Sequence, residues 1–139
     1  MPLTYENMKA CVEKFFDTLP TVEPKTADNL RQLLTPDFNC RWRAENYNRE
    51  QWVDHVCRHH FEYRATIDYK NPPFYITVDE KKHIVSTYMR EEFRHPVTRE
   101  LIDSITLVCH YECVLVGNEV RIKSELIAQV PQFISGFSR

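Results

Sequence analysis

Glycine is scarce in this chain: Gly117 and Gly136 are the only two among 139 residues. The phosphate-binding loops of nucleotide enzymes need several glycines close together, because their backbone must approach the phosphate closely. P-loop and dinucleotide-binding chemistry is therefore not expected. The sequence also shows no nucleophile elbow and no Ser/His/Asp arrangement that would suggest a serine hydrolase.

Clusters of basic residues and long apolar runs are also missing. The formal net charge is −2, and no block of Lys and Arg occurs that would bind nucleic acid or an anionic membrane. No apolar stretch approaches the ~20 residues of a membrane span, and the first residues lack the charged and apolar regions of a secretory signal. We expect a cytoplasmic protein with neither nucleic acid nor membrane as a partner.

The cysteines lack the spacing of a disulfide framework or a zinc ribbon. Their number is odd and no Cys-x-x-Cys pair occurs, which favours reduced and mostly buried thiols. His55 and His59 lie one helical turn apart and could chelate a metal, but the intervening glutamate of the zinc-protease motif is absent. We expect a solvated helix end there and no metal. The cysteines are Cys11, Cys40, Cys57, Cys109 and Cys113.

Hydrophobic periodicity predicts helices in the first half of the chain and strands in the second. The length and the 42% share of hydrophobic residues suit a single domain spanning residues 1–139. Thr4 and Thr26 are expected N-caps, and Asn48 with Gln51 resembles a capping box. The fold class is α+β, with three N-terminal helices packed on a curved antiparallel β-sheet. The expected helices cover 4–19, 26–35 and 49–60, and the expected strands 37–43, 65–69, 74–78, 83–93, 102–116 and 120–130.

The dipeptide Gly117-Asn118 joins the last two strands and has the chemistry of a two-residue hairpin turn. Such a turn fixes the register. Counting outward from it, Glu112 meets Lys123, and His110 meets Glu125. This pairing places an imidazole beside a carboxylate on one sheet face as a candidate acid/base dyad. A slip of one residue would separate the two groups.

Three short segments carry a resemblance to a known family: Leu33–Phe38, Asn48–Trp52 and Arg121–Leu126. Together with the element order, they resemble the SnoaL-like branch of the nuclear transport factor-like superfamily, which includes small fungal enzymes of natural-product pathways. The resemblance implies a conical pocket, chemistry without metal or organic cofactor, and a homodimer. Many SnoaL-like chains end in a Glu-aromatic-x-Asp motif. Here 125–128 keeps the glutamate and lacks the aspartate.

The superfamily hosts ketosteroid isomerases, scytalone dehydratase, polyketide cyclases and epoxide hydrolases. By resemblance we expect a cofactor-independent isomerase, cyclase or dehydratase acting on a hydrophobic, oxygenated polycyclic substrate. His110 and Glu125 would transfer protons, and Arg41, expected on one strand face with Arg43, would stabilise negative charge. The expected substrate-binding residues are Tyr88, Tyr111, Glu112 and Trp42.

A second interpretation assigns the same fold to a non-enzymatic, dimeric binding or interaction module. In that case His110 and Glu125 would lie in solvent or in a dimer contact, as a cross-strand pair worth up to ~1 kcal/mol. A third interpretation is an inactive paralogue whose cavity is filled. The position of these two side chains relative to a cavity distinguishes the interpretations.

Overall fold

The computed structural model describes residues 2–19, 25–62 and 64–131, and within these ranges the expected order of helices and strands is confirmed apart from one additional strand, at 45–48. None of the helices in these ranges is long and apolar enough to cross a membrane. The helices are α1 (Tyr5–Thr18), α2 (Thr26–Leu33) and α3 (Arg49–Glu62), and the strands are β1 (Leu34–Trp42), β2 (Glu45–Asn48), β3 (Arg64–Asp68), β4 (Tyr75–Asp79), β5 (Ile84–Arg94), β6 (Leu101–Val116) and β7 (Glu119–Gln129).

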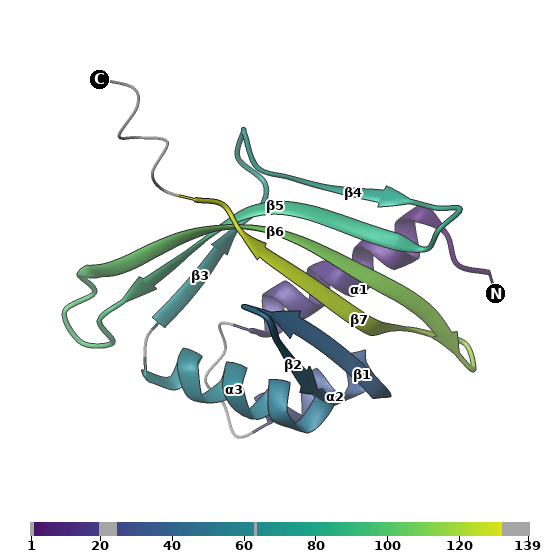
Figure 1. Ribbon diagram of the computed structural model, residues 1–139, viewed down its shortest axis with the longest axis horizontal. Helices are drawn as coiled ribbons and strands as arrows, with labels where there is room; N and C mark the ends of the chain where they lie inside the picture. Colours follow the sequence, from purple (N-terminus) through teal and green to yellow (C-terminus); the bar gives the residue numbers. More distant parts are fainter. Residues whose placement is uncertain (1, 20–24, 63, 132–139) are drawn as a thin grey trace.

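The strands form one curved sheet in the order β2-β1-β7-β6-β5-β3, with β4 paired to β5. The long strands β5 and β6 arch over the helices (Figure 1). The α+β cone expected from the sequence is confirmed, but the expectation of a purely antiparallel sheet is wrong. β1 runs parallel to β7, because most of the chain separates these strands and no hairpin dictates their direction.

Capping side chains fix the starts of two helices. Thr4 Oγ1 accepts a hydrogen bond from the backbone N–H of Asn7 at 3.1 Å, and Asn7 Oδ1 accepts one from Thr4 N at 2.8 Å. Asn48 and Gln51 form the same reciprocal pair at the start of α3, as predicted. The prediction for α2 is wrong by one residue, because Lys25 is the N-cap and Thr26 begins the helix.

Aromatic rings join α1 to the sheet. The ring centroids of Phe15 and Phe16 lie 5.9 and 5.7 Å from that of Tyr111 on β6, both in edge-on geometry. Such pairs add ~1 kcal/mol to the free energy gained by burial alone. Four of the five cysteines are buried and all five are free, as expected from the sequence.

The β6–β7 hairpin follows the predicted register only near its turn. Gly117 has φ +62°, which a glycine adopts at little cost, and the pairing runs as expected to Cys113 opposite Ile122. Beyond this point β7 contains a bulge, and Lys123 is the extra residue. Glu112 therefore lies opposite Ser124.

The bulge makes the predicted His110–Glu125 pair wrong. Tyr111 lies opposite Glu125, and His110 lies opposite Leu126. Successive side chains of a strand point to opposite faces, so one extra residue moves Glu125 to the concave face of the sheet. The predicted Glu112–Lys123 pair is wrong for the same reason.

The strand β2 was not expected from the sequence. It pairs with β1 through a two-residue turn, in which Arg43 and Ala44 have φ values of +52° and +64°. Two-residue hairpin turns of this kind usually use Asn or Gly. The missing signal explains why the hairpin was not predicted.

Candidate functional site

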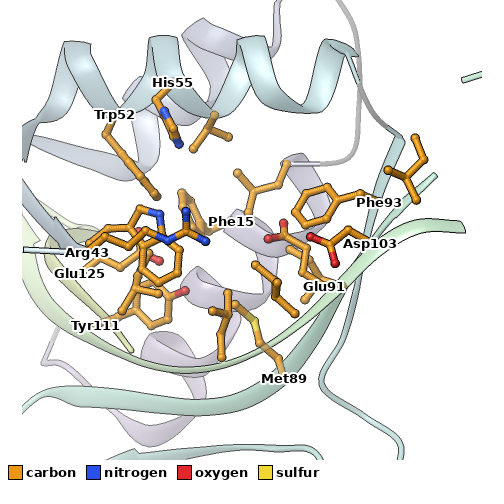
Figure 2. A pocket seen from close by; sticks show the side chains of 18 residues that line it. Phe15, Arg43, Trp52, His55, Met89, Glu91, Phe93, Asp103, Tyr111 and Glu125 are labelled. Atoms are coloured by element: carbon orange, nitrogen blue, oxygen red, sulfur yellow. The ribbon is translucent and has the colours of Figure 1, made fainter. Parts of the chain in front are cut away.

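A cavity of about 380 Å³ lies between the concave face of the sheet, α1 and α3 (Figure 2). Most of its lining is apolar, and its polar groups are few, which is typical of a small-molecule site. The lining residues are Phe15, Leu19, Trp42, Arg43, Trp52, His55, Val56, Ile67, Met89, Glu91, Phe93, Ile102, Asp103, Ile105, Leu107, Tyr111, Glu125 and Ile127.

Glu125 on β7 is the deeply buried acid of this cavity, with 4% of its surface exposed. Burial raises the pKa of its carboxyl group to about 7, and the negative charge of Glu91 acts in the same direction. The nearby Tyr111 hydroxyl, Cys40 thiol and Trp52 indole lower the pKa but do not cancel the effect of burial. Both protonation states of Glu125 are therefore populated at neutral pH.

Three buried polar atoms beside one another lack a completed hydrogen bond in the described part of the chain: Glu125 Oε1, the Tyr111 hydroxyl and Trp52 Nε1. Figure 2 shows Tyr111 and Glu125 at one end of the cavity, with Trp52 reaching toward them from α3. Buried polar atoms are rarely left unpaired. A hydroxyl group of a bound ligand would satisfy all three, since its oxygen accepts from the Trp52 indole and the Tyr111 hydroxyl while its hydrogen is donated to the Glu125 carboxylate.

Two further carboxyl groups, those of Glu91 and Asp103, line the cavity on the side away from Glu125 (Figure 2). Glu91 comes from β5, and Asp103 lies opposite Phe93 at the start of β6. The cavity thus has an acidic side near Phe93. At its other end, near Tyr111, it has polar groups that could bind an oxygen atom of a ligand.

Among the described residues, the arginine that lines this cavity is Arg43, whereas Arg41 was the predicted one. The expectation that both arginines share a face is wrong, because Arg43 lies in the β1–β2 turn and Arg41 lies on the exposed outer face of β1. The Arg43 guanidinium lies 4.6 Å from the ring centroid of Trp42 and donates a hydrogen bond to Gln129 Oε1 at 3.2 Å. Figure 2 shows it reaching into the cavity.

Three other predicted site residues lie outside the cavity. His110 is exposed on the outer face of the sheet, where its Nδ1 lies 2.7 Å from Ser86 Oγ. Glu112 is exposed on the same face and accepts a hydrogen bond from a serine of β7. Tyr88 packs on that face with its ring 5.1 Å from that of Phe74. The structure therefore separates His110, Glu112, Tyr88 and Arg41 from the cavity, and brings Glu125, Tyr111 and Trp42 to it.

His55 does not lie at a solvated helix end as expected. It is half-buried, lines the cavity and stacks on Trp52 with the ring planes 15° apart. The side chain of His59 lies outside the described residues. Among the side chains that the structure describes, no group of three His, Cys, Asp or Glu could hold a metal ion.

Some residues that line the cavity were not among the predicted site residues. Strand periodicity does place Glu91 on the face of Met89, and helical spacing places Trp52 on the buried face of α3. The same patterns also describe ordinary core positions, so they do not separate a cavity wall from a packed core. In the expected strand 102–116 the same alternation places Asp103 on the face of Tyr111, but nothing in the sequence marks this position as part of a cavity.

Comparison with known proteins identifies the fold. No protein-family model and no curated protein sequence matches this chain, but solved structures match nearly all of it. The BvnE pinacolase from Penicillium brevicompactum matches with a TM-score of 0.71 and 12% identity, over 99% of this chain and 94% of that one. A protein described as a SnoaL-like polyketide cyclase, from Jannaschia sp. CCS1, matches with a TM-score of 0.67 and 13% identity, over 96% and 91%.

An NTF2-like protein of unknown function from Exiguobacterium sp. 255-15 also matches, with a TM-score of 0.66 and 10% identity. The match covers 88% of this chain and 99% of the other. The chain therefore has the α+β cone fold of SnoaL-like and NTF2-like proteins, in agreement with the resemblance found in its sequence.

Proposed function

We propose that this protein is a cofactor-independent enzyme that isomerises, cyclises or dehydrates a small substrate by acid/base catalysis in its cavity. The observation that carries the proposal is Glu125, a carboxyl group in a largely apolar cavity with a pKa of about 7. A catalytic acid or base works best when its pKa is near the working pH. The apolar walls suit a hydrophobic substrate, and the resemblance to SnoaL-like proteins supports an oxygenated polycyclic compound of natural-product metabolism.

The proposed mechanism needs one carboxyl group and two hydrogen-bond donors. Ionised Glu125 removes a proton from a carbon next to a substrate carbonyl, and the Tyr111 hydroxyl and Trp52 N–H stabilise the negative charge on the oxygen. The protonated carboxyl group then returns the proton to another carbon, which completes an isomerisation. In a dehydration it would instead protonate the departing hydroxyl group, which leaves as water.

Burial raises the pKa of Tyr111 well above its usual value, so its hydroxyl stays protonated and can donate. His110 has no part in this mechanism, because it lies on the outer face of the sheet. Tyr111 takes its place as the group that Glu125 faces across the strands. The cavity walls exclude water from this pair and so strengthen its electrostatic interactions with the substrate.

The base can be tested without the natural substrate. 5-Nitrobenzisoxazole opens when a base removes one C–H proton, and the product is followed by its absorbance. We expect the protein to accelerate this reaction with a pH midpoint near 7, because only ionised Glu125 acts as the base. Tyr111→Phe should move the midpoint upward, because the Tyr111 hydroxyl lowers the pKa of Glu125.

Glu125→Gln should reduce the rate to that of buffer, while Glu112→Gln serves as the matched control on the outer face. Equal rates for the wild-type protein and Glu125→Gln would refute the role of Glu125 as a base. A ligand that occupies the cavity without any proton transfer by the protein would favour the second interpretation, a non-catalytic binding module. The unpaired polar atoms of the cavity suit such ligand binding as well.

The proposal includes a homodimer that works in the cytosol. Its support is the exposed outer face of the sheet, where Leu126 is 48% exposed and Tyr75 50%, together with thiols that are all free. Sedimentation velocity at micromolar concentration measures the assembly directly. A single species of monomer mass, unchanged on tenfold concentration, would refute the dimer.

A further inference from the structure

The guanidinium of Arg43 has the position of a substrate-recognition group at the rim of the cavity. It reaches inward from the β1–β2 turn, over the ring of Trp42, and is held by a hydrogen bond to Gln129 of β7 (Figure 2). Both contacts restrict the side chain to one direction. A guanidinium that is already oriented loses little conformational entropy when it binds a ligand.

The backbone of the turn is what aims Arg43 at the cavity. In a regular strand Arg43 would share a face with Arg41, which points away from the cavity. Instead, Arg43 and Ala44 both adopt positive φ values, +52° and +64°, a conformation that costs a residue with a side chain ~1 kcal/mol or more. Backbone strain of this kind is concentrated at functional sites.

Within the described part of the chain, no carboxylate neutralises Arg43. Three carboxyl groups line the same cavity, yet no carboxylate of the described residues lies within 4.0 Å of its guanidinium nitrogens. The hydrogen bond to Gln129 uses Nη2, while a guanidinium has five N–H donors. Donors therefore remain for a planar anion such as a carboxylate, which arginine binds through two parallel hydrogen bonds.

We infer that Arg43 selects an apolar carboxylic acid as the substrate, by binding its carboxylate at the rim while the hydrocarbon part fills the cavity. This inference deepens the proposed function, on which it rests for the chemistry at Glu125. Asp103 on the opposite side repels the carboxylate, so the acid enters in one orientation. The reacting end of the substrate then reaches Tyr111 and Glu125.

The two tryptophans of the chain offer a direct readout, because both Trp42 and Trp52 line the cavity. Their indole N–H signals in a ¹H–¹⁵N NMR spectrum report ligand binding. Trp42 reports binding at the rim of the cavity, and Trp52 reports binding near Tyr111 and Glu125. The probes are 1-adamantanecarboxylate and 1-adamantanemethanol, which share a hydrocarbon cage and differ in charge. We expect the wild-type protein to bind the acid about tenfold or more tightly than the alcohol, as a charged hydrogen-bond pair contributes roughly 1.5–3 kcal/mol.

Arg43→Gln should bring the affinities for the acid and the alcohol within about twofold of each other, because the charged hydrogen bonds between the guanidinium and the carboxylate are lost. Arg43→Lys should keep part of the preference for the acid, because lysine keeps the positive charge but lacks the planar guanidinium that makes two parallel hydrogen bonds. The matched control is Arg41→Gln, which removes an arginine from the outer face of β1, two residues before Arg43, and should keep the full preference. Arg43 is exposed, so its replacement leaves the core intact.

An unchanged preference in Arg43→Gln, equal affinities in the wild-type protein, or no binding of either probe would each overturn the inference. Titration of the Glu125→Gln variant with the same two probes tests the inference independently of the proposed function. If Glu125 proves not to act as a base but the preference for the acid depends on Arg43, only the proposed function fails. If Glu125 acts as a base and no preference exists, only the inference fails.

Discussion

Burial of the Glu125 carboxyl group lowers the stability of the folded protein at neutral pH. Its pKa is about 7 in the folded state, against 4.5 for an unperturbed glutamate. Below pH 4.5 the group is protonated in both the folded and unfolded states. As the pH rises from 4.5 to 7 the unfolded chain loses the proton first, so stability falls, and above 7 the loss is complete. The shift corresponds to a loss on the order of 3 kcal/mol.

Glu125→Gln should remove this pH dependence, because the amide has the same shape and does not titrate. Relative to the wild-type protein, the variant should gain stability between pH 5 and pH 8, by an amount on the order of 3 kcal/mol. Urea denaturation at pH 5, 6, 7 and 8 measures the difference. Glu112→Gln, on the exposed face, should follow the wild-type curve. Parallel curves for the wild-type protein and Glu125→Gln would contradict the raised pKa.

The sequence placed Glu125, Tyr111 and Trp42 among the candidate site residues, and the structure brings these three to the cavity. The sequence predicted the wrong cross-strand partner for Glu125. The residues that follow it, Leu126 and Ile127, are both apolar, so they do not reveal the bulge. Period-two alternation cannot decide which of these two neighbours faces inward. Arg43 was placed on the wrong side because nothing in its residue type indicates a left-handed backbone conformation.

At the scale of elements, the bulge at Lys123 determines which groups reach the cavity. Ile122 and Glu125 both face inward although they are three residues apart, which a regular strand does not allow. The turn chemistry of Gly117-Asn118 predicted the hairpin and its first pairs. The bulge has no such local signature, because it depends on how β7 fits between β6 and β1.

Deletion of Lys123 should therefore be tolerated. Without this residue Ile122 and Ser124 become neighbours, and the pairing with β6 on both sides of the bulge stays as it is. We expect a stability loss of no more than ~2 kcal/mol and an unchanged pH dependence from Glu125. Urea denaturation at pH 5 and 8 tests both.

Deletion of Leu126 is the contrasting variant. It would turn Ile127 out of the cavity wall and should cost more stability than deletion of Lys123. If deletion of Lys123 unfolds the protein, or abolishes the pH dependence due to Glu125, the prediction is wrong. The bulge then does more than set the pairing register of β7.

At the scale of the whole molecule, the concave side of the cone encloses a cavity between the sheet, α1 and α3. An unfilled volume of about 380 Å³ forgoes the dispersion contacts that side chains would otherwise make. Proteins often keep such spaces at the cost of stability where function requires them.

Filling the cavity should therefore stabilise the protein and remove its activity. Ile127→Phe adds a ring beside Glu125 and should raise the free energy of unfolding by ~1 kcal/mol, while reducing the rate with 5-nitrobenzisoxazole at least tenfold. Leu126→Phe places the same ring on the outer face and should leave the rate unchanged. A more stable Ile127→Phe variant with full activity would show that the reaction occurs elsewhere.

The parallel pairing of β1 with β7 also has a consequence during synthesis of the protein. Cys40 of β1 lies opposite Glu125 of β7, so this contact joins an early part of the chain to a late one. During translation β1 leaves the ribosome long before β7 and has no partner on that side until β7 follows. The wall that holds the acidic group is thus among the last parts to assemble, and a nascent chain that has not yet released β7 has neither a closed cone nor a complete cavity.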